Sequence, residues 1–72
     1  MIYQLCNDIY TGQVSSAKLQ TETQTILFPF NPDNTDYQQF KININDESAQ
    51  LEDADGVLMS PEAAKAYVAT LP

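Results

Sequence analysis

The residues best suited to metal chemistry lie in the stretch LEDADGVLMSPE, residues 51–62. If Gly56 takes the sixth position of a calcium-binding loop, then Asp53, Asp55 and Glu62 fall at the third, fifth and twelfth positions. The first position should be an acid that anchors the ion, but here it is Leu51. A turn with solvated aspartates is therefore the favoured interpretation. Weak calcium binding through Asp53, Asp55 and Glu62 is the alternative.

Covalent and acid–base catalysis lack the groups that they need. Cys6 is the single cysteine, the chain has no histidine, and no lysine stands close in sequence to generate a thiolate. We expect Cys6 to be a buried or half-buried small apolar residue. The neighbouring acids Asp46–Glu47 and Glu52–Asp53 stand in polar segments, whereas a catalytic pair needs burial to shift its pKa values. The sequence therefore predicts neither an enzyme nor a bound cofactor.

The overall charge argues against two classes of partner. Ten acidic residues face three lysines, which gives a formal charge of −7. Nucleic acids and anionic membranes both attract cationic proteins, so we expect direct contact with neither. We interpret the charge as a solubility feature. The alternative is mimicry of nucleic acid, in which carboxylates imitate phosphates and occupy a basic groove.

A chain of 72 residues has room for a single domain, residues 1–72, with one small core. A domain of this size buries only about 60% of the surface that its unfolded chain exposes. Small domains compensate with disulfides, a metal or association. One cysteine excludes an internal disulfide, so we expect a homo-oligomer or docking on a larger assembly.

The first thirty residues have the composition of short strands. Residues 2–6, IYQLC, have the β-branched and aromatic content of a short strand, and the residues around Gly12 then predict a turn. Residues 14–30 are polar at first and apolar at the end, which predicts one or two strands, each with a solvated face. Proline cannot donate to a ladder, so the second strand should end near Pro29.

The stretch FPFNPDNTDYQQFK, residues 28–41, predicts a strand-to-helix corner. Pro32 and its neighbours form the turn, and Asn34 or Thr35 caps the helix, with Asp36 in the first turn. The helix then carries a stripe at i, i+3, i+4 and i+7, made of Tyr37, Phe40, Lys41 and Ile44. The alternation in KININ favours a strand instead, so the end of this helix is open.

A second turn and a second helix follow. Asp55–Gly56 predicts a hairpin or hairpin-like loop within residues 49–60, and Ser60–Pro61–Glu62 has the capping pattern of a helix start. That helix should run to about Leu71 and bury the positions Ala64, Tyr67, Val68 and Leu71. The predicted fold class is α+β: a small antiparallel β-sheet, hairpin or meander, with two short helices packed on it.

Aromatic residues supply the one positive sign of a binding role. Four tyrosines and three phenylalanines are many for so small an interior. Most must serve the core, but tyrosines that remain exposed favour partner interfaces. The candidates for a protein interface are Tyr3, Tyr10, Phe28, Phe30 and Tyr37.

The corner and the ending together resemble a group of small proteins of tailed phages, including phages of cyanobacteria. The residues that carry the resemblance lie in the last two thirds of the chain: the corner residues Phe28, Pro29, Asn31, Pro32, Asn34, Asp36, Tyr37, Gln38 and Phe40, the DADG turn and the helix that ends in LP. The stretch KININDESAQ departs from the pattern, in which a more regular helix would continue. The resemblance implies a phage origin and no particular activity.

These observations favour a non-enzymatic structural or interaction protein of a phage, most simply a capsid, neck or tail accessory component of the virion. The alternative is an acidic, host-directed protein that binds and inhibits a host enzyme or a nucleic-acid-binding protein. Either way the expected partners are proteins. The N-terminal residues lack the features of a secretion signal, and no apolar run approaches the ~20 residues of a membrane span. The expected location is the host cytoplasm or the virion.

Overall fold

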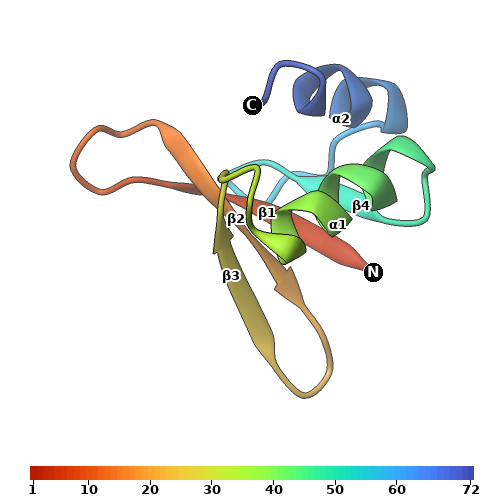
Figure 1. Cartoon of the computed structure of the whole chain (residues 1–72), viewed down its shortest axis with the longest axis horizontal. Coiled ribbons are helices and arrows are strands. Elements are labelled where there is room, and N and C mark those ends of the chain that lie inside the picture. The colour runs from red at the N-terminus through yellow and green to blue at the C-terminus, as the bar shows by residue number, and fades with distance from the viewer.

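The N-terminal part of the chain alternates apolar and polar residues and forms a meander of three antiparallel strands. The computed structural model describes residues 1–72, and its strands are β1 (Ile2–Asn7), β2 (Val14–Gln20), β3 (Thr25–Pro29) and β4 (Gln50–Glu52). The sheet order is β3-β2-β1-β4 (Figure 1). Pro29 is the last residue of β3, as the sequence predicted.

The fourth strand makes the sheet mixed. β1–β2 and β2–β3 are antiparallel, but β4 pairs parallel with β1, with Tyr3 opposite Leu51. The chain leaves β3 through α1 (Thr35–Asn45), which returns it to the end where β1 begins, so β4 runs in the direction of β1. The α+β class is confirmed, and the expectation of a wholly antiparallel sheet is wrong in this one strand.

The first helix begins where its capping residues predicted. The Asn34 side chain accepts a hydrogen bond from the Tyr37 N–H at 3.0 Å, and Asp36 lies in the first turn. Helical structure continues through KININ to Asn45, so the alternative of a strand there is wrong. Asp46 caps the C-terminus of the helix, and the next residue, Glu47, takes a left-handed φ of 61° although it is not a glycine.

The second helix, α2 (Pro61–Val68), begins at a Ser60 cap whose hydroxyl oxygen accepts from the Ala63 N–H at 3.2 Å. It is shorter than expected, because the α-helical hydrogen-bond pattern gives way after Val68 to turns with i to i−3 bonds. The Thr70 N–H donates to the Tyr67 carbonyl, and the Leu71 N–H donates to the Val68 carbonyl. Between β4 and α2, Leu58 pairs with Glu52 in an isolated antiparallel bridge, which confirms the hairpin-like loop. Neither helix is long and apolar enough to cross a membrane.

Both helices pack on the same face of the sheet (Figure 1). The core consists of alternate strand residues and the inner faces of the helices: Tyr3, Leu5, Ala17, Phe28, Tyr37, Phe40, Ile44, Leu51, Ala64 and Val68. Its centre is aromatic, with Tyr3 edge-on to both Phe28 and Phe40 at centroid distances of 6.0 and 4.9 Å. The opposite face of the sheet carries no helix.

One polar side chain lies inside this core. Asn43 of α1 donates from Nδ2 to the Tyr3 hydroxyl at 3.0 Å, and its Oδ1 accepts from Gln39 Nε2 at 2.9 Å. No buried side-chain nitrogen or oxygen lacks a partner. Because a buried amide is costly unless it is hydrogen-bonded, this arrangement fixes α1 against β1.

Candidate protein-binding site

The β1–β2 hairpin projects away from the two-layer body of the molecule (Figure 1). Its loop contains two adjacent large apolar residues, and both are almost fully exposed: Ile9 at 88% and Tyr10 at 91%. Residues 8–13 are called the hairpin tip from here on. Two adjacent apolar side chains that are exposed in the folded chain can gain free energy when a partner buries them.

The hairpin tip is held in a defined shape by its own hydrogen bonds. Asp8 Oδ1 accepts from the Tyr10 N–H at 2.7 Å and from the Thr11 N–H at 3.3 Å. The main chain closes beneath it, with the Asp8 N–H bonded to the Gln13 carbonyl at 2.7 Å. Such Asx-type bonds shape a turn locally, so the two apolar side chains are presented without a large ordering cost on binding.

Glycine is required at one position of the hairpin tip. Gly12 has a φ of 71°, and a Cβ placed there would meet no atom within 4 Å. The requirement therefore comes from the left-handed backbone and not from crowding. The Gly12 N–H donates to the Asp8 carbonyl at 2.8 Å, which ties this residue to the aspartate that shapes the tip.

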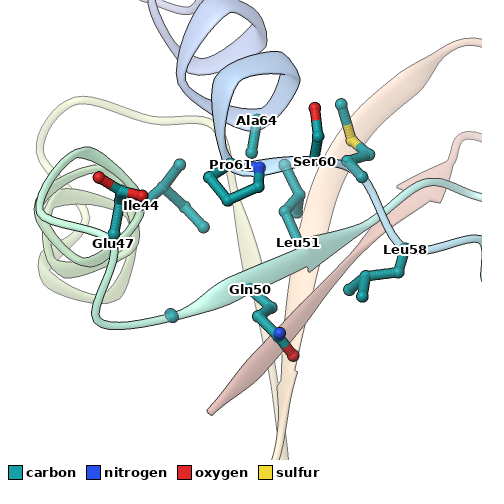
Figure 2. Close-up of a pocket in the computed structure, with 10 residues that line it drawn as sticks. Ile44, Glu47, Gln50, Leu51, Leu58, Ser60, Pro61 and Ala64 are labelled. Atoms are coloured by element: carbon teal, nitrogen blue, oxygen red, sulfur yellow. The ribbon is translucent and has the colours of Figure 1, made fainter.

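A second surface feature is a groove of about 450 Å³ between the end of α1, β4 and the start of α2. Figure 2 shows Ile44 and Leu51 pointing toward Pro61 and Ala64, which form its apolar wall, while Gln50 points away from α2. The acid at the rim, Glu47, is bonded to Lys65 at 2.9 Å. The groove can accept an apolar group.

The structure corrects three of the five predicted interface residues. Tyr3, Phe28 and Tyr37 are buried, because each belongs to the face of its strand or helix that meets the other layer. Phe30 is half-buried and stacks on Phe40 with an interplanar angle of 7°. Tyr10 is exposed, as an interface residue must be.

Sequence reasoning missed Ile9, the neighbour of Tyr10. A signal was present: the segment NDIYTG places two large apolar residues between an Asx-type turn residue and a glycine, where neither can reach a core. It also missed the buried amide of Asn43. This residue lies on the buried face only if KININ is helical, and the sequence left a strand open there.

The residues considered for metal and covalent chemistry are placed as follows. Asp53 Oδ1 accepts from the Asp55 and Val57 N–H groups at 2.9 and 3.0 Å, so this carboxylate shapes its own loop. No group of three or more Cys, Asp or Glu side chains is arranged to hold a metal ion. Cys6 is half-buried, and its Sγ lies 3.7 Å from the Gln4 carbonyl oxygen.

No protein-family model, curated protein or solved structure matches this chain. The resemblance to small proteins of tailed phages therefore stays a prediction.

Proposed function

We propose that this chain is a non-enzymatic protein-binding subunit that docks through its hairpin tip, and that it serves as an accessory component of a phage virion. The observation that supports the docking role is the pair Ile9 and Tyr10, exposed at 88% and 91% on a tip that hydrogen bonds hold in place. The phage context comes from the resemblance of the corner and the DADG turn.

The chemistry of the tip indicates what kind of surface it fits. An aliphatic and a phenolic side chain on adjacent residues suit an apolar pocket with a hydrogen-bond acceptor or donor at its floor for the Tyr10 hydroxyl. Asp8 is the only charged residue of the tip, and its carboxylate is already bonded to two backbone N–H groups. Salt should therefore affect this docking only weakly.

The distribution of acids bears on the host-directed alternative. The ten acids lie in six separate segments of the chain, mostly at turns and helix ends: Asp8; Glu22; Asp33 and Asp36; Asp46 and Glu47; Glu52, Asp53 and Asp55; and Glu62. A mimic of nucleic acid needs carboxylates spaced like phosphates along one face. No single helix or strand therefore carries the regular row of carboxylates that would most simply imitate phosphates.

Quantitative mass spectrometry of purified particles tests the proposal. A virion component is present at a fixed number of copies per particle, and replacing Ile9 and Tyr10 by serine removes it from particles while it still folds. A protein that is missing from particles but co-purifies with one host protein from infected cells contradicts the virion role and supports the host-directed alternative.

A further inference from the structure

The outer edge of β3 is a row of backbone groups with no partner strand. β3 is the last strand of the sheet, and hydrogen-bonded positions alternate in an antiparallel ladder. Because the Phe30 N–H bonds to the Ser15 carbonyl, the main-chain groups of Phe28 and Ile26 also face β2. The main-chain groups that face outward are those of the alternate residues Thr25, Leu27 and Pro29.

The outer edge of β3 lacks most of the features that prevent an edge strand from pairing with a strand of another molecule. Charged side chains, bulges and covering segments are the usual protections. Here residues 23–32 carry no charge, between Glu22 and Asp33, in a chain whose formal charge is −7. Leu27 is 66% exposed on the face of the sheet that no helix covers. Pro29 alone opposes pairing, because it has no N–H to donate.

We propose that β3 pairs antiparallel with β3 of a second copy of this chain, about a two-fold axis at Leu27. Each Leu27 then donates its N–H to the Leu27 carbonyl of the other copy. Each Thr25 stands opposite Pro29 of the other copy and donates to its carbonyl. Pro29 cannot return a hydrogen bond to the Thr25 carbonyl, so the pairing has four main-chain hydrogen bonds, two at Leu27 and two from Thr25, and leaves the two Thr25 carbonyls unpaired.

A second copy fits this edge better than an unrelated strand does, because the edge is complementary to itself. The middle residue of β3 is Leu27, so the two exposed leucines meet on the open face and cover each other. The pairing also joins the two acidic chains along residues 23–32, which contain no carboxylate. This is where self-association of a strongly acidic chain costs least.

The two-fold axis has a consequence for docking. Because the paired strands run in opposite directions, the two hairpin tips point to opposite ends of the extended sheet. The dimer could then bridge two partner molecules but could not place both tips on one site. This consequence rests on the proposed function, whereas the pairing itself does not.

Disulfide trapping tests the pairing directly. In a hydrogen-bonded antiparallel pair the Cα atoms are about 5.5 Å apart, within the range of about 4.4–6.8 Å that a disulfide spans. Leu27→Cys in a Cys6→Ser background should form a covalent dimer under mild oxidation. The control is Val57→Cys in the same background, since Val57 is similarly exposed at 61% but lies outside β3. The Leu27 variant should crosslink about tenfold faster or more; equal rates overturn the proposal.

Amide hydrogen exchange and light scattering supply a second readout. At rising protein concentration the amides of Thr25 and Leu27 should become protected, while those of Ile26 and Phe28 are protected throughout. Leu27→Pro removes the outward N–H without disturbing the bonds to β2 and should leave a folded monomer. If that variant does not fold, Leu27→Lys, which places like charges opposite each other, should also be monomeric.

Each outcome is decisive for the pairing. A wild-type chain that stays monomeric at every concentration overturns the proposed pairing. Protection of the Leu27 amide only after a different protein is added also overturns it, because the edge of β3 then receives a strand from another protein. Tyr10→Ser should leave the dimer intact. Loss of docking and loss of pairing can therefore be told apart.

Discussion

Replacing Asp8 by alanine tests whether the hairpin tip is held in its docking shape before any partner arrives. The substitution removes the carboxylate oxygen that accepts from the Tyr10 N–H at 2.7 Å and the Thr11 N–H at 3.3 Å. The main-chain bonds of Asp8 to Gln13 and Gly12 remain. The loop should therefore stay closed while the segment that carries Ile9 and Tyr10 opens more often.

The expected magnitude follows from the two bonds. A hydrogen bond to a charged acceptor is the stronger kind, but this one is exposed to water, so the 2.7 Å bond should contribute about 1 kcal/mol. The 3.3 Å bond is long and should add a few tenths of a kcal/mol. A loss of about 1 kcal/mol corresponds to roughly a fivefold higher opening equilibrium at the Tyr10 amide.

The assay is amide hydrogen exchange at Tyr10 and Thr11, together with urea denaturation of the same samples. Asp8→Asn is the matched control, because it keeps an oxygen acceptor and should lose less than half as much as alanine. If Asp8→Ala exchanges its Tyr10 amide at the wild-type rate and unfolds at the wild-type urea concentration, the carboxylate does not shape the tip.

Three further predictions concern the core and the tip. Tyr3→Phe removes the hydroxyl that accepts from Asn43 and should lower the free energy of unfolding by about 1–3 kcal/mol. Tyr10→Phe, at an exposed position, should change the free energy of unfolding by less than about 0.5 kcal/mol. Similar losses for the two variants in urea titrations would contradict the argument from burial. Burial raises the pKa of Tyr37 above its ordinary value of 10.0. Folding therefore favours the neutral phenol, so the contribution of Tyr37 to stability is complete below pH 10.0 and declines as the pH rises through the folded-state pKa. Tyr37→Phe should flatten the alkaline side of the plot of stability against pH, and an unchanged plot would refute this. Serine at both tip positions should leave stability within about 0.5 kcal/mol per substitution but weaken partner binding by about 2 kcal/mol, or about 30-fold.

Local rules predicted most of the elements. The Asn34 and Ser60 caps fix where both helices begin because each side chain satisfies an amide that the helix leaves free. The Asp55–Gly56 turn and the end of β3 at Pro29 follow from backbone chemistry in the same way. These features depend on neighbours in sequence, so the sequence alone could specify them.

The parallel pairing of β4 and the buried Asn43 depend on contacts across the fold. Nothing in QLE, three residues long, indicates which strand it joins, since its direction is set by the path of α1. Asn43 is tolerated inside because Tyr3, forty residues away in the chain, supplies a hydroxyl. Local patterns contain neither piece of information.

The candidate interface was only partly predictable for a related reason. Successive side chains of a strand point to opposite faces of the sheet, and Tyr3 shares the buried face of β1 with Leu5. Tyr10 follows the strand inside a turn, where alternation no longer applies and the side chain cannot reach the core. Position relative to the end of β1 distinguishes the two tyrosines better than residue type does.

Site-specific photo-crosslinking from the hairpin tip tests the central claim most directly. A photoreactive phenylalanine analogue replaces Tyr10 in one variant and Ala66, an exposed residue of α2, in the control, and both are irradiated in phage-infected cells. Docking through the tip predicts one dominant adduct with a single protein from position 10 and none from position 66. Equal, unselective labelling from the two positions would contradict it.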